Sequence, residues 1–381
     1  MNDAASAASE RLRFRDPQRA RELAAALTLR VEEALRVTQT DRLAIMHVCG
    51  SHEQAIAKFG LRSLVPEKLD VIMGPGCPVC VTDAPEIDDA VALADAGILV
   101  ATYGDMYRVR GSGRSLADAH AEGAPVEVVY SVSQAVELAR THDGDVVFFA
   151  CGFETTAVTT AAALVAGVPP NFFVLSAHKY VLPAMEAVAG LPESRIAAFL
   201  AAGHAATITG SAIFEPFVAR HGIPVVVAGF EPLDVLAALV KAVEAIRDGA
   251  GGVFNCFPRC VTREGNLPAQ ARLWQVFELE DGDWRGIAEV PSGNIRLRPE
   301  WRHVDARYRF AHLRPGATAS TEPDACICGT IMIGRANPVD CSLFRVRCTP
   351  QDPVGACMVS TEGTCRIWHE YGGLPILAAS R

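Results

Sequence analysis

Residues 145–156 read DVVFFACGFETT, a nearly continuous apolar run that ends in a glycine-containing polar loop. A run that is apolar at almost every position is typical of a parallel strand covered on both faces of its sheet. A helical stretch follows the loop, so this part of the sequence predicts a strand–loop–helix unit.

The same rhythm recurs along the chain. Helical stretches such as 84–97 and 231–249 alternate with these runs, which indicates an α/β fold with parallel sheets. An amphipathic helix over 16–37 precedes them. Seven further runs of this kind cover residues 42–49, 68–76, 97–104, 125–131, 171–178, 195–204 and 223–230.

The number of strands predicts two related α/β units rather than one large sheet. GFETT at 152–156 and GFEPL at 229–233 both follow a buried strand, a weak internal echo. From about residue 250 the rhythm stops, and the cysteine-rich tail needs a metal centre in place of an apolar core. The expected division is domain I at 40–124, domain II at 125–235, and domain III at 1–39 with 236–381.

The composition excludes several classes of protein. Half of the 381 residues are apolar, 21% are charged and the net charge is -9, which argues against a nucleic-acid binder. No uncharged run reaches the roughly 18 residues of a membrane span. The polar N-terminus has no apolar segment of a secretory signal, so we expect a cytoplasmic protein with neither membrane nor nucleic-acid partners.

The predicted strands end in residues that can carry chemistry. Ligands of open α/β sheets bind at the carboxyl ends of the strands, and parallel strands would bring these loops to one edge. Glu154, His178 and His204 are candidates to line a cleft there and to handle protons. Each could instead be an ordinary hydrogen-bonded side chain or a helix-terminal carboxylate.

Cys49 follows the first predicted strand. Ser51 and Gln54 fit a capping box, which would place Cys49 just outside a helix N-terminus, where the helix dipole favours a thiolate. His52 is close enough in sequence to act as a ligand, a base or a hydrogen-bond partner. The alternative is a buried cysteine that only fills space.

Cys77 and Cys80 lie in GPGCPVCVTD, residues 74–83. Asp83 and Glu86 fit a second capping box, so the pair precedes a helix, where thiol pKa values are lowered and a disulfide can close. A zinc knuckle would need a second Cys-x-x-Cys, and the sequence has none. The spacing favours a redox pair over a metal site or a structural turn.

Six of the twelve cysteines lie close to the C-terminus of the sequence, among prolines and glycines that keep the backbone in turns. Four thiolates can hold an iron–sulfur cluster or zinc, and the long spacings favour a cluster only modestly. Disulfides are the least favoured reading. These cysteines are Cys326, Cys328, Cys341, Cys348, Cys357 and Cys365.

Taken together, these motifs resemble one family, HypD, a maturation protein of [NiFe] hydrogenases. The resemblance covers about residues 40–375. The segments that carry it are VCGSHEQAI, GPGCPVCVT, YGDMYRV, FFACGFETT, AGHAATITG, VVAGFEP, VTREGN, WRG and DCSLFRVRCTPQDPVGACMVSTEGTC.

The resemblance implies two related α/β units and a third domain with a [4Fe-4S] cluster. It also implies a scaffold on which an Fe(CN)2CO centre is assembled, together with a small HypC-type partner and a HypE-type partner that carries cyanide as a thiocyanate. Such a protein is a scaffold with redox chemistry rather than a conventional turnover enzyme.

The family's functional residues can be carried over by motif. Cys49 corresponds to the iron ligand with His52 beside it, and Cys77 with Cys80 corresponds to the redox pair. The implied cluster ligands are Cys341, Cys348 and Cys365, with Cys326 or Cys328 as the fourth and Cys357 ranked below them.

Two departures from the family pattern bear on the site. Glu53 stands where the family more often has threonine, and would place a carboxylate beside the proposed iron ligand. Cys151 replaces an aliphatic residue.

Two other classes of function stay open at this stage. One is a thiol–disulfide oxidoreductase whose tail binds zinc. The other is a pure assembly adaptor that binds no iron at Cys49.

Overall fold

A computed structural model describes residues 13–192, 194–315 and 325–373. The chain divides into two compact units, and each is described by itself. Unit 1 comprises Met1–Gly76, Val188–Asn266 and Ile367–Arg381, and unit 2 comprises Cys77–Ala187 and Leu267–Arg366. The predicted α/β class is confirmed, because each unit is built on a sheet whose strands are mostly parallel.

Unit 1 contains a five-stranded parallel sheet in the order β2-β1-β7-β8-β9. Its strands are β1 (Leu43–His47), β2 (Leu69–Met73), β7 (Ile196–Ala202), β8 (Val225–Ala228) and β9 (Val253–Asn255). Its helices are α2 (Pro17–Thr38), α3 (Gly50–Lys58), η1 (Leu61–Leu64), α11 (Gly203–Thr209), η2 (Ala212–Phe214), α12 (Glu215–His221) and α13 (Pro232–Arg247).

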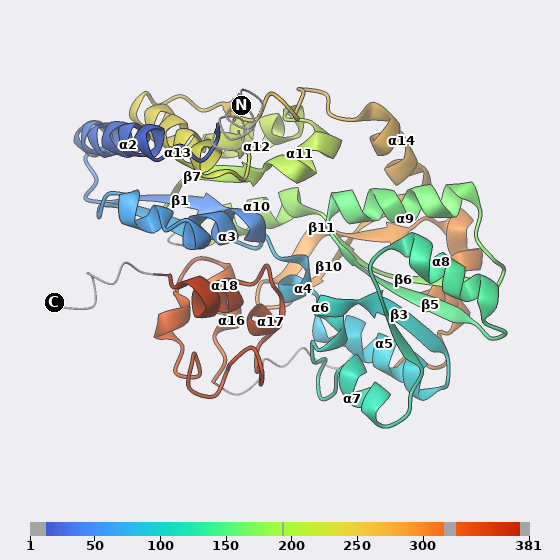
Figure 1. The fold of residues 1–381 in the computed structure, drawn as a ribbon. Helices are drawn as coiled ribbons and strands as arrows, with labels where there is room; N and C mark the ends of the chain where they lie inside the picture. Colours follow the sequence, from blue (N-terminus) through green and yellow to red (C-terminus); the bar gives the residue numbers. More distant parts are fainter. Residues whose placement is uncertain (1–12, 193, 316–324, 374–381) are drawn as a thin grey trace, which may run out of the picture. The chain divides into compact units, whose positions relative to one another are not determined.

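The predicted amphipathic helix is α2, which packs along α13 in unit 1 (Figure 1). Leu27 and Val31 of α2 are buried with Leu239 of α13 and Ile45 of β1 in one apolar core. The apolar positions recur at helical spacing in both helices, so each buries one face against the other and against the sheet. This core fixes the strands whose carboxyl ends carry the first group of functional residues.

Unit 2 contains a six-stranded sheet in the order β10-β11-β6-β5-β3-β4. Its strands are β3 (Leu99–Tyr103), β4 (Val126–Val129), β5 (Val146–Gly152), β6 (Phe172–Lys179), β10 (Phe277–Trp284) and β11 (Ala288–Leu297). Its helices include α4 (Pro78–Val81), α5 (Ala84–Asp95), α6 (Gly104–Tyr107), α7 (Leu116–Ala121), α8 (Val132–Thr141), α9 (Glu154–Ala166), α14 (Leu267–Val276), η3 (Pro299–Val304) and α15 (Ala306–Arg309). In Figure 1, α8 and α9 accompany β5 and β6.

The stretch DVVFFACGFETT forms β5 and the start of α9. Every residue of β5 is buried, and β5 pairs in parallel with β3 and β6. Covering by chain on both faces explains why the strand is apolar throughout. The antiparallel hairpin of β10 and β11 adds to β6, in a region where the sequence predicted only irregular structure.

The cysteine-rich segment of unit 2 has little regular structure. It contains α16 (Cys328–Met332), η4 (Pro338–Asp340) and α17 (Ala356–Val359) joined by turns, and it leads into α18 (Thr364–Tyr371). The remaining helix, α10 (Val181–Ala189), follows β6.

The strands are not grouped as the expected segments 40–124 and 125–235 would group them. β3 lies within 40–124 but pairs with β4 and β5, while β7 and β8 pair into the sheet of β1 and β2. Contiguous segments therefore do not coincide with the sheets. The crossover of parallel strands permits this, since neighbours in a parallel sheet need not be neighbours in sequence.

Candidate functional site

The expectation that all functional loops share one sheet edge is wrong. β1, β7 and β8 end on the sheet of unit 1, whereas β3, β5 and β6 end on that of unit 2. The structure therefore brings Cys49, His52 and His204 into unit 1, and the disulfide pair with the C-terminal cysteines into unit 2.

Cys49 is the N-cap residue of α3, and α3 begins at Gly50. The sequence placed the cap at Ser51, two residues too late, because Gly50 already has helical geometry and its N–H donates to the carbonyl of Gly76. A Cβ on Gly76 would lie 2.1 Å from the Cys49 nitrogen, so only glycine allows this approach. The thiol of Cys49 thus lies at the positive end of α3 in unit 1.

The Cys49 thiol lies beside a histidine. Its Sγ is 3.8 Å from Nδ1 of His204, at the start of α11. The ring of Phe230 lies 4.9 Å from the ring of His52 and 5.2 Å from that of His204, so one aromatic side chain contacts both histidines. The structure thus collects three sequence-predicted residues around Phe230 in unit 1.

His52 is held as a neutral imidazole. Its Nε2 lies 3.1 Å from the carbonyl of Gly229 and 3.3 Å from that of Ala228, so Nε2 carries the hydrogen and donates it. Nδ1 then has a free lone pair, and it is buried without a hydrogen-bond partner. Burial, followed by the charge of His47, lowers the pKa of His52 to about 3. A buried imidazole with an available lone pair is suited to ligate a metal ion or to accept a proton.

Glu53 does not orient His52. It is fully buried, and its carboxylate accepts hydrogen bonds from His47 Nε2 at 2.8 Å, Arg62 at 2.7 Å and Trp368 Nε1 at 2.6 Å. His47 Nδ1 lies 3.2 Å from the carbonyl of Cys49, so both of its ring nitrogens face oxygen atoms. The attraction of Arg62 and the bond from His47 outweigh burial and hold the pKa of Glu53 well below its usual range. Glu53 therefore fixes the backbone of the Cys49 loop through His47.

Cys77 and Cys80 form a disulfide at the start of α4 in unit 2. Both residues are buried, and the backbone N–H of Cys80 donates to Cys77 Sγ at 3.1 Å. The predicted capping box between Asp83 and Glu86 is present at the start of α5. The bond between the two sulfurs leaves neither thiol available to a metal in this state, and the role of the pair in redox chemistry stays a prediction.

Two polar contacts fix the end of α4. The buried Arg285 donates from Nε to the carbonyl of Thr82 at 3.0 Å, and its backbone N–H donates to the carbonyl of Val81. The hydroxyl of Thr82 donates to the carbonyl of Pro78 at 2.8 Å, so its one hydrogen is used there. The thiol of Cys151, 3.3 Å away, must then be the donor to Thr82.

Cys151 is accordingly a protonated thiol. Burial is the main cause that raises its pKa, to about 12, and Thr82 opposes this only in part. The side chain that departs from the family pattern is therefore an unreactive thiol next to the disulfide helix.

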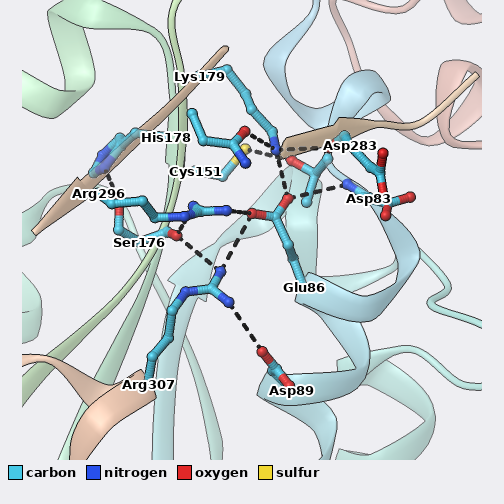
Figure 2. Close-up of polar contacts among 12 residues, drawn as sticks. Asp83, Glu86, Asp89, Cys151, Ser176, His178, Lys179, Asp283, Arg296 and Arg307 are labelled. Atoms are coloured by element: carbon cyan, nitrogen blue, oxygen red, sulfur yellow. Dashed lines mark hydrogen bonds and ion pairs between the residues drawn. The ribbon is translucent and has the colours of Figure 1, made fainter. Parts of the chain in front are cut away.

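A buried charge cluster anchors the helix that follows the disulfide (Figure 2). Glu86 of α5 accepts from Lys179 Nζ at 2.8 Å, from Arg296 at 2.7 Å and from Arg307 at 3.3 Å. Arg307 also contacts Asp89 at 3.2 Å. The three cations outweigh burial and hold the pKa of Glu86 well below its usual range. Sequence reasoning missed this cluster because its members are far apart in the chain.

Glu154 and His178 lie at the ends of β5 and β6 in unit 2. Oε1 of Glu154 accepts the backbone N–H of Val181 at 2.8 Å. His178 is fully buried, with Nδ1 at 3.0 Å from Ser176 Oγ and Nε2 at 3.4 Å from Thr160 Oγ1. Burial lowers the pKa of His178 to about 3. The role in a cleft that the sequence suggested for these two residues stays a prediction.

The C-terminal cysteines converge on one pocket in unit 2. Its lining is made of thiols and apolar side chains: Cys326, Cys328, Cys341, Cys348, Cys365, Ile331, Leu343, Phe344 and Met358. A Cβ on Gly355 would lie 2.5 Å from Cys328 Sγ and 2.7 Å from Cys326 Sγ, so glycine makes room for both thiols. The backbone N–H of Val354 donates to Cys348 Sγ at 3.3 Å, as it would to a thiolate ligand.

The residues present fit an iron–sulfur cluster. Soft thiolate donors in an apolar shell are the usual environment of such a group. Cys357, which the sequence ranked last as a ligand, is buried and is not part of the pocket lining, and the neighbouring Cys328 thiol raises its pKa. Among the described residues, no three His, Cys, Asp or Glu side chains are arranged to hold a single metal ion.

The sequence profile of the HypD family, described as "Hydrogenase formation hypA family", matches residues 22–372. The chain belongs to the HypD family. A HypD-family member with a cysteine-rich region of this kind is a candidate metal-binding protein.

Curated relatives cover nearly the whole chain. The hydrogenase maturation factor HypD of Azotobacter vinelandii is 41% identical over 371 residues, which is 94% of this chain and 96% of that protein. A putative hydrogenase expression/formation protein of Methanocaldococcus jannaschii is 45% identical over 336 residues, covering 87% of this chain and 92% of that protein. HypD of Escherichia coli K12 is 38% identical, with 94% and 98% covered. This HypD-family chain is thus similar to hydrogenase maturation factors along its full fold.

The described part of this HypD-family chain contains no helix long and apolar enough to cross a membrane.

Proposed function

We propose that this protein is the scaffold on which the Fe(CN)2CO centre of a [NiFe] hydrogenase is assembled. The observation that carries the proposal is the division of thiol chemistry between the units. Unit 1 holds a reactive thiol, Cys49, beside His204 and near the unpartnered Nδ1 of His52. Unit 2 holds a disulfide and a pocket of five thiols.

The iron atom is the substrate of this scaffold. Cys49 is the proposed ligand, because a thiolate at a helix N-terminus suits a soft, low-spin iron that carries cyanide and carbon monoxide. His204 can accept the proton that Cys49 loses when it binds iron. A small HypC-type protein is the proposed second holder of the iron.

The proposed cyanide donor is a thiocyanate on a cysteine of a HypE-type partner. Releasing cyanide from that sulfur requires two electrons, and the dithiol form of Cys77 and Cys80 supplies both when it closes to the disulfide. The thiocyanate sulfur leaves as a thiol with one of the two protons, cyanide binds the iron, and the second proton is released. The disulfide present in unit 2 is then the spent form of the pair.

The proposed resident cofactor of unit 2 is a [4Fe-4S] cluster in the thiol pocket. Such a cluster supplies electrons one at a time. Cys341, Cys348 and Cys365 are the proposed ligands, with Cys326 or Cys328 as the fourth. The apolar side chains of the pocket exclude water from these thiols.

The iron site is tested by infrared spectroscopy. We expect a Cys49→Ala variant, purified anaerobically with its HypC-type partner, to lose the cyanide and carbonyl stretching bands of the wild-type complex. Bands of wild-type intensity in that variant would refute Cys49 as the ligand and favour a pure adaptor. Cys260→Ala is a matched control, because Cys260 is an exposed thiol of the same unit.

Metal analysis tests the pocket. Iron and sulfide in equal amounts, lost in Cys348→Ala, support the cluster. Zinc without sulfide would instead support the thiol–disulfide oxidoreductase with a zinc-binding tail.

A further inference from the structure

The short helix α6 and its C-cap residue form hydrogen bonds with the cysteine-rich segment at two places within unit 2. Oδ2 of Asp105 accepts three hydrogen bonds, from Ser360 Oγ at 3.1 Å, from Thr361 N at 3.0 Å and from Thr361 Oγ1 at 3.0 Å. Three residues later, the C-cap residue Arg108 donates to the carbonyls of Pro350 at 3.1 Å and Gln351 at 2.9 Å. Asp105 and Arg108 are called the clasp below.

The backbone that carries Asp105 and Arg108 is held by the core of unit 2. Met106 and Val109, which alternate with the clasp residues, are completely buried in unit 2. α6 also follows β3 directly, a strand paired on both sides. The two polar side chains therefore project from an element that cannot shift without disturbing the core of the unit.

The two gripped stretches flank functional cysteines. Pro350 and Gln351 follow Cys348 closely, and Ser360 and Thr361 lie between α17 and Cys365. Both cysteines line the thiol pocket. The clasp therefore fixes the chain on each side of α17, shortly after Cys348 and shortly before Cys365.

α17 is also the part of the cysteine-rich segment that packs against α4, the helix of the disulfide. The thiol of Cys328, a member of the pocket, raises the pKa of Cys357 in α17, so the two side chains lie close together. One chain of contacts within unit 2 thus leads from the pocket through α17 to Cys77 and Cys80. Ser360, the residue that follows α17, is only 1% exposed and bonds to Asp105.

We propose that Asp105 and Arg108 are positioning residues that hold the thiol pocket in register with the disulfide of α4. This inference rests on the proposed function, in which the disulfide must be reduced again after each use. Opening it takes two electrons and two protons and yields the two thiols of Cys77 and Cys80. The electrons come from an external low-potential one-electron donor, which must act twice.

Asp105 contributes more than Arg108. Hydrogen bonds to a charged carboxylate are stronger than those between neutral groups, and Asp105 is half-buried with a buried partner in Ser360. Arg108 is exposed and donates to carbonyls at the surface, where such contacts contribute little.

The test compares four proteins under anaerobic conditions: wild type, Asp105→Ala, Asp105→Asn and Asp88→Ala. Asp88 is a matched control, since it accepts the backbone N–H and hydroxyl of Ser112 in unit 2 with the same chemistry as Asp105. Three quantities are measured: iron and sulfide content, amide hydrogen exchange over 348–361, and the rate at which reduced methyl viologen converts Cys77 and Cys80 to alkylatable thiols. A fifth protein, Cys348→Ala, lacks a proposed cluster ligand, so it gives the rate at which methyl viologen reduces the disulfide without the cluster.

We expect Asp105→Ala to keep its iron and sulfide but to reduce the disulfide at least about tenfold more slowly, because a displacement near 1 Å can cost up to about 100-fold. Amide exchange over 348–361 rises by about tenfold or more in metal-free protein as well. Asp105→Asn, which keeps an oxygen acceptor, recovers part of both effects, and Asp88→Ala matches wild type.

The outcomes distinguish failure of the clasp proposal from failure of the proposed redox function. A wild-type disulfide that viologen reduces no faster than in Cys348→Ala refutes the redox part of the proposed function. Wild-type rate and exchange in Asp105→Ala, with normal reduction in wild type, overturn the clasp. If Asp105→Ala loses iron or fails to fold, Thr361→Val decides, since it removes a single bond: an unchanged rate and unchanged exchange in that variant also overturn the proposal.

Discussion

Both units have a buried carboxylate four to six residues after a functional cysteine, but its partners differ between the units. Glu53 follows Cys49 in unit 1, and Glu86 follows the Cys77–Cys80 pair in unit 2. Both are fully buried against cations, and both have pKa values well below the usual range. Glu53 therefore fixes the helix whose start carries Cys49, and Glu86 fixes α5, the helix that follows the disulfide.

The partners differ in origin and in charge. Glu53 binds His47 and Arg62, which are near it in sequence, and Trp368, an uncharged donor. All three cations of Glu86 come from distant strands and helices, at separations of 93, 210 and 221 residues. The cysteine loop of unit 1 is thus fixed largely by its neighbours, whereas that of unit 2 depends on the completed fold.

Glu86→Gln should have the largest effect. The change leaves Lys179, Arg296 and Arg307 facing one another around a neutral group, and breaking a buried ion pair in this way costs about 3–5 kcal/mol. Urea unfolding of the anaerobic protein measures the loss. Glu137→Gln, an exposed partner of Arg140, is the control and should change stability by less than about 0.5 kcal/mol. A loss below about 1 kcal/mol for Glu86→Gln would mean that water solvates the cations and that the cluster does not anchor α5.

Glu53→Gln should cost less, about 2–3 kcal/mol, for two reasons. Glutamine still offers an oxygen to Trp368, and the Arg62 side chain is 15% exposed and can gain water. The same unfolding measurement, made side by side with Glu86→Gln, checks the ranking. An equal or larger loss in Glu53→Gln would show that the uncharged and local partners matter as much as the three distant cations.

The contrast also explains what could be predicted from sequence. The eight predicted strands and the helix of residues 16–37 are present, because apolar runs and helical spacing are local signals. The capping box at Asp83 was found for the same reason. The cap of α3 was misplaced by two residues, since the geometry of Gly50 depends on its contact with Gly76.

The rest required the fold. The sequence of a single strand does not show which sheet the strand joins. The division of the functional loops between two sheets could therefore not be predicted. Lys179 ends an apolar strand and Trp368 lies in the tail, and neither has a local signal for its carboxylate partner. The hairpin of β10 and β11 carries no alternating signal, because FELEDGDW is buried only at Phe277 and Trp284, its two ends.

Acidification should destabilise the protein through one buried histidine in each unit. His52 in unit 1 and His178 in unit 2 each have a pKa lowered to about 3 by burial. The unfolded chain binds a proton at each histidine near pH 6.5 while the native state does not, so this stability is fully present above pH 6.5 and is lost as pH falls. Between pH 7.5 and pH 5.0 each histidine should lower the free energy of unfolding by about 2 kcal/mol.

Unfolding curves of His52→Gln and His178→Asn at the two pH values test this. Each variant should flatten the pH dependence by about 2 kcal/mol, whatever its effect at pH 7.5. The exposed His142 is a suitable control, and His142→Gln should leave the slope unchanged. A wild-type slope in either buried-site variant would show that the histidine is protonated, or exposed, in the native protein.

Cys151→Val should have the smallest effect. The Cys151 thiol donates one weak bond to Thr82, whose own hydrogen already goes to Pro78, so valine removes little and keeps the volume and burial of the site. We expect a change in stability below about 1.5 kcal/mol, the usual limit for a volume-conserving change in a core. The Cys77–Cys80 pair should be reduced at the wild-type rate, because Thr82 still closes α4 onto Pro78 and Arg285 still holds its last carbonyls. Thr82→Val removes the internal bond instead and provides the comparison. If Cys151→Val slows reduction more than Thr82→Val does, the thiol takes part in the exchange, and burial alone has not made it inert.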